Sequence, residues 1–245
     1  MTFAKDAEIF APRNVMAWLL FSLTAGSVNA GAFMACRNFV SHVTGTITSL
    51  GVEFGESWLA LKYMLVFAAF FGGAAIAALV TVTLRLRDKQ QIVVPMLLVF
   101  LVLLSVAAAG HGGLFGPFGL EEPTSGSFVL LSLLAAAMGI QNSAIGLATS
   151  NAIRTTHATG PVTDLAVNVV RAMLGTKEAS AREWKWALLR SAKLTMFIGG
   201  ALVTTRYASI LEYRTFTISA MFLLAGVVLT GLSEVTRVGD QSVRL

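Results

Sequence analysis

Two stretches of the chain follow one pattern, and they decide how the fold is organised. Residues 41–52 read SHVTGTITSLGV, and residues 156–167 read THATGPVTDLAV. Both contain His-x-Thr-Gly-x-x-Thr-x-Leu, and the pattern uses two of the chain's three histidines, His42 and His157. Each stretch comes directly after a long apolar segment. A pattern written twice in this setting indicates an internal repeat.

The composition is typical of an integral membrane protein. Of the 245 residues, 56% are hydrophobic and 13% are charged, which is about half the charged share of ordinary soluble domains. The charges gather in short gaps between apolar runs, so several segments are long enough to span a bilayer. The net charge of +5 is interpreted as the Lys and Arg of cytoplasmic loops and not as a nucleic-acid surface. The lipid bilayer is the expected partner.

Six segments are apolar over about 19 residues or more, close to the ~20 that a bilayer core of ~30 Å requires. They are residues 14–36, 59–84, 92–110, 127–149, 187–207 and 215–233. Two further segments, residues 39–55 and 155–175, carry the repeated pattern and are rich in Thr, Gly and Ser. We predict an all-α polytopic membrane protein of six transmembrane helices, in which these two segments are re-entrant or broken half-helices.

The positive charges favour this number of spans. With six spans and a cytoplasmic N-terminus, 14 of the 18 Lys and Arg lie inside and four lie outside. If the two half-segments also crossed the membrane, the basic cluster at residues 85–89 would face outward, against the positive-inside tendency. Both termini are therefore expected in the cytoplasm.

The repetition extends beyond the opening pattern. Residues 26–30 read GSVNA where residues 139–143 read GIQNS. Likewise, residues 71–74 read FGGA where residues 198–201 read IGGA. The paired glycines are expected to allow close packing between helices.

The chain thus divides into two units of three spans, residues 14–110 and residues 127–233, with residues 111–126 as an external linker. Because three is an odd number, the second unit enters the membrane from the opposite side. This is the inverted-topology repeat found in many transporters. A homodimer is left open, since the Gly-rich faces could pack between protomers as easily as within one.

Each half-segment is expected to begin a short helix within the membrane. In the second copy Thr159 or Gly160 suits a helix cap and Pro161 suits the first helical position. Thr44 and Gly45 do the same in the first copy. Under inverted symmetry the capping ends meet near the middle, where unpaired N–H donors favour an anion or a carboxylate.

The candidate solute-binding residues are polar groups of the two breaks and of the neighbouring spans. They are His42, Thr44, Gly45, Thr48, His157, Thr159, Gly160, Thr163, Asn29, Gln141 and Asn142. Asp164 and Arg154 are candidate coupling or pathway charges, and either histidine could carry a coupling proton. Alternatively, the amides and hydroxyls hold helices together, and Asp164 lies at the surface.

Other classes of protein find little support in the motifs. The chain lacks His-Glu-x-x-His, Gly-x-Ser-x-Gly and a phosphate-binding Gly-rich loop with Lys, so we expect neither an enzyme nor a catalytic residue. Cys36 is the single cysteine, and two histidines with few acids nearby do not favour a metal site. We expect no cofactor. Residues 176–186 are expected to form a short amphipathic piece on the cytoplasmic surface.

The motifs at residues 26–33, 40–45, 139–142 and 154–165 together resemble the YoaK-like family of bacterial inner-membrane proteins, long catalogued as a domain of unknown function. The resemblance spans nearly the whole chain. It implies a small polytopic protein of the bacterial inner membrane, and it implies no established reaction.

The sequence therefore predicts a transporter or facilitator for a small anionic or zwitterionic solute, with the paired half-helix motifs as its central site. Two alternatives remain open. A channel of the same architecture would use the motifs to line an open polar path. A non-transporting membrane partner or sensor would use them to hold its fold together.

Overall fold

The computed structural model describes residues 6–55, 57–86, 92–119, 124–156 and 158–242. Across these residues the chain forms helices and no strand. The elements are α1 (Asp6–Ile9), α2 (Pro12–Cys36), α3 (Val43–Val52), α4 (Ser57–Leu86), α5 (Val93–His111), α6 (Ser125–Ala148), α7 (Thr159–Leu174), α8 (Lys177–Leu211), the 3₁₀ turn η1 (Glu212–Arg214) and α9 (Thr215–Ser242). His157 lies outside the described residues.

Within the described residues, five helical stretches are long and apolar enough to cross a membrane. They are Pro12–Cys36, Trp58–Leu84, Val93–His111, Ser125–Ala148 and Lys177–Gly231. The fifth contains α8 and the first part of α9, which η1 joins. Helices suit this setting because each one satisfies its own backbone N–H and C=O groups where no water is present. The expected class, a multi-pass helical membrane protein, is confirmed.

The expectation of a separate surface piece at residues 176–186 is wrong. This segment forms the first turns of α8, which runs without a break from Lys177 to Leu211. Its Lys, Glu, Ala and Arg residues are good helix formers, and no Gly or Pro interrupts them. At 1.5 Å per residue, the 35 residues of α8 extend over about 52 Å, well beyond a ~30 Å hydrocarbon core.

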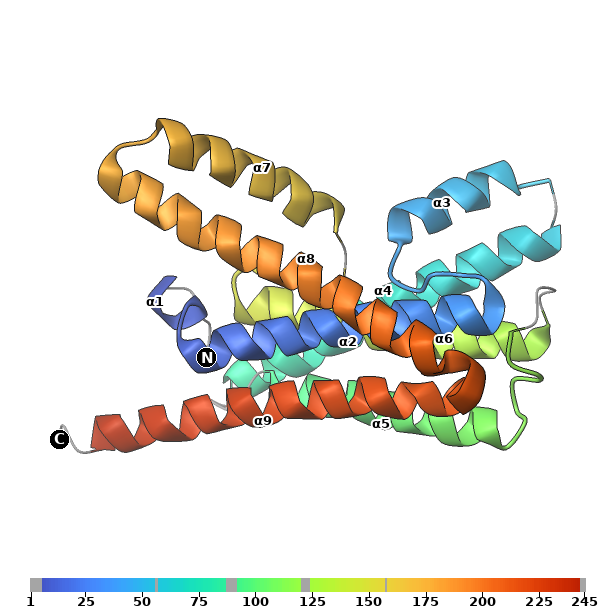
Figure 1. Ribbon diagram of the computed structural model, residues 1–245. Helices are drawn as coiled ribbons and strands as arrows, with labels where there is room; N and C mark the ends of the chain where they lie inside the picture. The colour runs from blue at the N-terminus through green and yellow to red at the C-terminus, as the bar shows by residue number, and fades with distance from the viewer. Residues whose placement is uncertain (1–5, 56, 87–91, 120–123, 157, 243–245) are drawn as a thin grey trace.

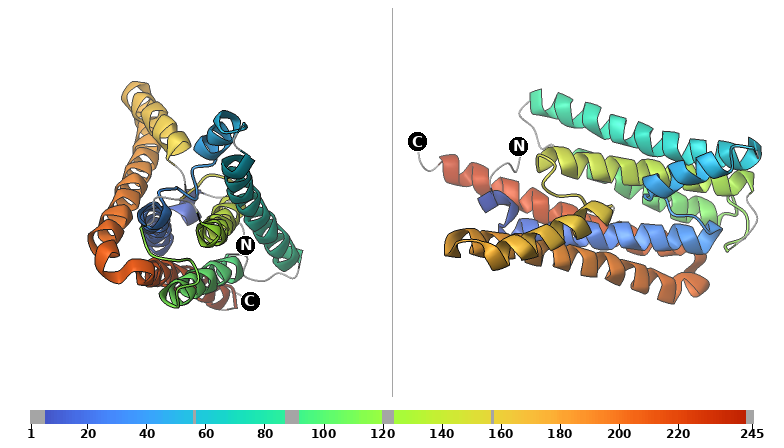
Figure 2. Two further views of the ribbon diagram at one scale, coloured as in Figure 1. Left: turned by 90° about the vertical axis from the view of Figure 1, so that its right-hand side faces the viewer. Right: turned by 90° about the horizontal axis from the view of Figure 1, so that it is seen from above.

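Two close helix crossings form the centre of the bundle, α2 against α8 and α4 against α6 (Figures 1 and 2). A Cβ added at Gly26 would lie 1.9 Å from the carbonyl oxygen of Phe197, and one at Gly200 would lie 1.9 Å from that of Leu23. The crossing of α4 and α6 has the same kind of contact. A Cβ at its two glycines, Gly73 and Gly139, would each lie 2.1 Å from a carbonyl oxygen of the other helix. The close packing expected at Gly73 and Gly200 is confirmed.

The other two long helices, α5 and α9, complete the bundle. α9 packs on α2 and on α5, and α5 packs on α6. The largest fully buried side chains of this core include Trp18, Phe21, Leu131 and Phe216. At one end of the bundle Tyr213 of η1 donates a hydrogen bond to the carbonyl oxygen of Gly116, 3.1 Å away. This contact ties the α8–α9 turn to the segment that links the two halves of the chain.

The two half-helices, α3 and α7, project from the bundle. α3 lies alongside the start of α4, and α7 lies alongside α8. Their N-terminal ends point toward each other near the middle of the molecule (Figure 1). Each half-helix begins slightly earlier than expected, with His42 and Ala158 as the N-cap residues. Pro161 is therefore the third helical residue, where its missing N–H still costs nothing because the first turn has no partner for it.

Candidate functional site

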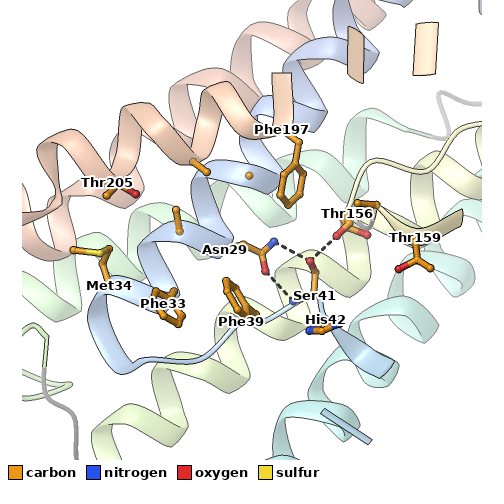
Figure 3. Close-up of a pocket in the computed structure, with 14 residues that line it drawn as sticks. Asn29, Phe33, Met34, Phe39, Ser41, His42, Thr156, Thr159, Phe197 and Thr205 are labelled. Carbon is orange, nitrogen blue, oxygen red and sulfur yellow. Dashed lines mark hydrogen bonds between the residues drawn. The ribbon is translucent and has the colours of Figure 1, made fainter. Parts of the chain in front are cut away.

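A cavity of about 510 Å³ lies where the two helix breaks meet. Its walls come from α2, the segment between α2 and α3, the segment before α7, and α8 (Figure 3). The lining residues are Gly26, Asn29, Ala30, Phe33, Met34, Phe39, Ser41, His42, Thr156, Ala158, Thr159, Phe197, Ala201 and Thr205. The structure thus brings together four of the predicted solute-binding residues. Asn29, His42 and Thr159 line the cavity, and Gly45 lies against the ring of His42.

Asn29 holds the first break against α2. Its Nδ2 donates to Ser41 Oγ at 2.8 Å and to the carbonyl oxygen of Ala25 at 2.8 Å. Its Oδ1 accepts from the backbone N–H groups of Val40 and Ser41, each at 3.2 Å. An amide side chain has two donors and two acceptor positions, so all of them are used within the protein. Asn29 therefore fits the alternative interpretation, in which the amide side chains hold the fold together.

Ser41 joins the two breaks directly. Its hydroxyl donates to the carbonyl oxygen of Thr156 at 2.5 Å, across 115 residues of sequence. Ser41 was not among the residues predicted from the sequence. Its position could have indicated it, because a residue with a hydroxyl group stands immediately before the histidine in both copies of the pattern.

Gln141 holds the second break against α2. Its Nε2 donates to the carbonyl oxygen of Phe21 at 2.8 Å and to Thr155 Oγ1 at 3.0 Å. Three buried oxygen atoms here have no hydrogen-bond partner among the described residues: Gln141 Oε1, Asn142 Oδ1 and Thr156 Oγ1. The second break is therefore less completely satisfied than the first, and one of these atoms belongs to a residue that lines the cavity.

His42 stands at the start of α3 and is exposed on the cavity. Its ring lies across the first turn of the helix, so that a Cβ added at Gly45 would be 2.6 Å from His42 Nδ1. Phe39 meets the ring edge to face, with centroids 6.3 Å apart. The glycine of the motif is explained by this contact, because any larger residue would displace the imidazole.

Four other predicted binding residues lie away from the cavity wall: Thr44, Thr48, Gly160 and Thr163. Thr48 Oγ1 donates to the carbonyl oxygen of Thr44 at 2.9 Å, and Thr163 Oγ1 donates to that of Thr159 at 3.2 Å. These hydroxyls bond within their own helices, as Thr often does in helix interiors. Gly160 is exposed at the start of α7. Whether any of them binds a solute stays a prediction.

The two candidate pathway charges are engaged in contacts outside the cavity. Asp164 is exposed and lies 3.1 Å from Arg190 of α8, and Arg190 also donates to Asn168. Asn168 in turn donates to Glu183. Arg154 is exposed and donates to Asn151 Oδ1 at 3.2 Å. The polar side of α7 is thus bonded to α8, which explains how a half-helix with an exposed apolar side stays attached.

Both half-helix N-termini open on the cavity. The first helical N–H bonds run from Thr46 to the carbonyl oxygen of His42 and from Val162 to that of Ala158. Neither N-cap residue makes a side-chain hydrogen bond to its helix. The N–H groups before these bonds give each end a partial positive charge. Such ends attract anions.

In the part of the chain that the structure describes, no group of three or more His, Cys, Asp or Glu side chains is placed to hold a metal ion. The described residues give the cavity helix N-termini, hydroxyls, the amide of Asn29, the imidazole of His42 and aromatic rings.

The fold and the cavity together define a multi-pass helical membrane protein with a small-molecule-sized site between two helix breaks. Residues 17–229 match the family described as "Protein of unknown function (DUF1275)", so the chain belongs to that family. This agrees with the resemblance to YoaK-like proteins. No curated protein and no solved structure matches the chain.

Proposed function

We propose that the protein is a transporter or facilitator for a small anionic or zwitterionic solute, which binds in the cavity between the two half-helices. The observation that carries the proposal is that both copies of the repeated pattern contribute to one cavity. His42 comes from the first copy, and Thr159 comes from the second. Intramembrane sites of this kind, at facing half-helix ends, are typical of secondary transporters.

The packing of the glycines supports two inverted repeats of three spans. Gly26 in α2 and Gly139 in α6 are equivalent in the two halves, and so are Gly73 in α4 and Gly200 in α8. In every case the carbonyl oxygen that faces the glycine lies three residues before the partner glycine, as Phe197 precedes Gly200. Equivalent helices thus cross by equivalent contacts, as a two-fold axis relating the halves requires.

The same proposal counts α8 and α9 as separate spans, because η1 reverses the chain between them (Figure 1). This makes six spans with α3 and α7 as half-helices. The start of α2, the end of α9 and the α7–α8 connection lie at one end of the bundle, and the α3–α4 connection lies at the other (Figure 1). With the positive-inside rule, the first end faces the cytoplasm of a bacterium and the protein resides in its inner membrane.

The proposal is tested by solute flux into proteoliposomes. Purified protein is reconstituted, a mixture of small carboxylates and amino acids is added outside, and the lumen is analysed by mass spectrometry. The His42→Ala/His157→Ala double variant is compared with wild type at matched folded amounts. We expect flux with wild type and loss of most of it in the double variant. Thr217→Ala is the control, because Thr217 lies in α9, off the cavity, and its hydroxyl bonds the carbonyl oxygen of Arg214.

A second pair of variants tests the position of His42 without removing it. Gly45→Ala displaces the imidazole, whereas Gly51→Ala adds a methyl group to the same helix where no atom lies within 4 Å. Flux should fall in the first variant and persist in the second. Equal flux in all variants would show that the motif is not part of the transport pathway. If wild type gives no flux and the histidine variant does not fold, the result would favour a non-transporting membrane partner or sensor.

The channel alternative is separated from the carrier by the concentration dependence of the same flux. A carrier saturates as its site fills, because each solute must be carried through a conformational cycle. Flux that rises linearly far beyond carrier rates would favour the channel.

A further inference from the structure

The cavity has an apolar side and a polar side (Figure 3). On the apolar side the rings of Phe33 and Phe39 stack with centroids 4.9 Å apart and planes 15° apart. Met34 lies on the same side (Figure 3). Phe197 of α8 adds a third ring to the lining. Thr205 is a polar neighbour on this side (Figure 3). A surface dominated by aromatic rings solvates a charged group poorly, and the free energy falls when an apolar group covers it.

The polar side is built to receive negative charge. His42, Thr156 and Thr159 gather there (Figure 3), next to the two uncapped helix ends. The hydroxyl of Thr156 is a second and independent sign of a ligand, because its side chain is 1% exposed, lines the cavity and has no hydrogen-bond partner. A buried hydroxyl without a partner is costly. A bound group with acceptor oxygens would satisfy it.

The charges around the cavity favour an anion over a cation or a zwitterion. Among the described residues that line the cavity, none is acidic. An ammonium group would therefore find no carboxylate to pair with.

The size and polarity of the cavity further restrict the class of anion that it can bind. At about 30 Å³ for a water-sized group, a cavity of about 510 Å³ holds roughly 17 such groups. An inorganic anion or acetate would leave the aromatic walls uncovered. A dicarboxylate of matching length would place its second charge against Phe33 and Met34, where the hydroxyl of Thr205 is the polar group of the described lining, so it would lose much of its hydration at a large desolvation cost. The guanidinium of Arg37 lies over the Phe33 ring, but Arg37 is not among the residues that line the cavity.

We propose that the cavity binds monocarboxylates with an apolar body, such as medium-chain or aromatic acids. The carboxylate lies at the half-helix ends beside His42 and Thr156, and the body lies on Phe33, Phe39 and Phe197. This inference rests on the proposed function, because it names the substrate class of the same site, but binding can be measured without transport.

The experiment measures binding to the purified full chain in detergent by titration calorimetry, with flux of the same compounds measured separately in proteoliposomes. The probes are benzoate and hexanoate, with benzamide, acetate, succinate and phenylalanine as comparisons. We expect benzoate and hexanoate to bind at least about tenfold more tightly than each comparison. A charge-assisted hydrogen bond and a covered aromatic wall are each large enough to produce a difference of that size.

Two variants test which part of the ligand each side of the cavity binds. Thr156→Val keeps the shape of the side chain and removes the hydroxyl. It should weaken the binding of benzoate and leave the binding of benzamide unchanged. Phe39→Ala should weaken benzoate and leave acetate unchanged, and Phe39 is half exposed, so its removal is tolerated by the fold. Thr217→Val, in α9 and off the cavity, should leave the binding of both compounds unchanged.

The outcomes separate this inference from the transport proposal. Benzoate binding with the expected variant pattern but no flux would keep the substrate class and overturn transport. Flux of amino acids or succinate, with no preference for benzoate, would keep transport and overturn the substrate class. Equal binding of benzoate and benzamide, or equal binding by wild type and both cavity variants, would also overturn it.

Discussion

Asn29 and Asn142 occupy equivalent positions in the two halves of the chain, yet they have different surroundings. Asn29 uses all of its hydrogen-bonding capacity to hold the segment before α3. Asn142 leaves its Oδ1 without a partner. In the first half the amide is structural, and in the second half a hydrogen-bonding position is left for something else. The sequence repeat alone would have assigned both residues the same role.

At the residue scale we predict that Asn29→Ala destabilises the fold far more than Asn142→Ala. The first variant leaves the N–H groups of Val40 and Ser41 without their acceptor, a cost of about 2 kcal/mol or more. The second removes an acceptor that bonds nothing, so it should cost less than about 0.5 kcal/mol. Denaturant unfolding of both variants in the same detergent measures the difference. Equal losses would contradict the asymmetry between the two breaks.

At the scale of helices, the crossings explain why glycine pairs recur in the sequence. Only one glycine of each pair lies in the contact. A Cβ at Gly200 would meet backbone at 1.9 Å, whereas one at Gly199 would meet only the end of the Leu23 side chain at 3.6 Å. In the first half a Cβ at Gly73 would lie 2.1 Å from backbone, and one at Gly72 would meet no atom within 4 Å. The helices approach this closely because small residues let their backbones nearly touch.

The element-scale prediction follows from this difference. Gly200→Ala and Gly73→Ala should each destabilise the protein by about 1–3 kcal/mol, because the methyl group pushes two helices apart. Gly199→Ala and Gly72→Ala should be neutral or slightly stabilising, since Ala favours the helix by about 1 kcal/mol over Gly. Thermal unfolding followed by size-exclusion chromatography tests the four variants. The same ranking in both halves is expected, and a ranking in one half alone would count against equivalent crossings.

For the whole molecule, the two half-helix hairpins have their tips at opposite ends of the bundle (Figure 1). The α3–α4 connection follows Val52, and the α7–α8 connection lies at Gly175 and Thr176. In a membrane the two tips would face opposite sides. In the inverted repeat that we propose, this arrangement follows from an odd number of spans in each half.

We predict that the two tips are labelled from opposite sides of the inner membrane. In a Cys36→Ala background, Glu53→Cys should react with a membrane-impermeant maleimide on intact spheroplasts. Thr176→Cys should react only after the membrane is permeabilised. Labelling of both from the same side would contradict the inverted repeat. Cys36 itself is buried and donates to the carbonyl oxygen of Ala32, so its replacement by Ala is a small change.

By itself the sequence determined the membrane class, the two half-helices, and the bounds of the long helices to within a few residues, except that α8 begins ten residues before its predicted span and α9 ends nine residues after its own. These features depend on local composition and on turn residues, which act within a single segment. It also indicated His42, Thr159 and the paired glycines. It missed the aromatic wall of Phe33, Phe39 and Phe197, because Phe in an apolar span looks the same whether it faces lipid or a cavity.

Only the tertiary structure decided which of the repeated residues share a site. The Ser41–Thr156 bond joins residues far apart in the chain, and the cavity wall combines α2 with α8. Both depend on how closely the glycine crossings bring the helices together, and no local pattern encodes that distance. The same crossings decide that Asn29 is saturated and Asn142 is not, because hydrogen bonding depends on the arrangement of neighbours within about 3 Å.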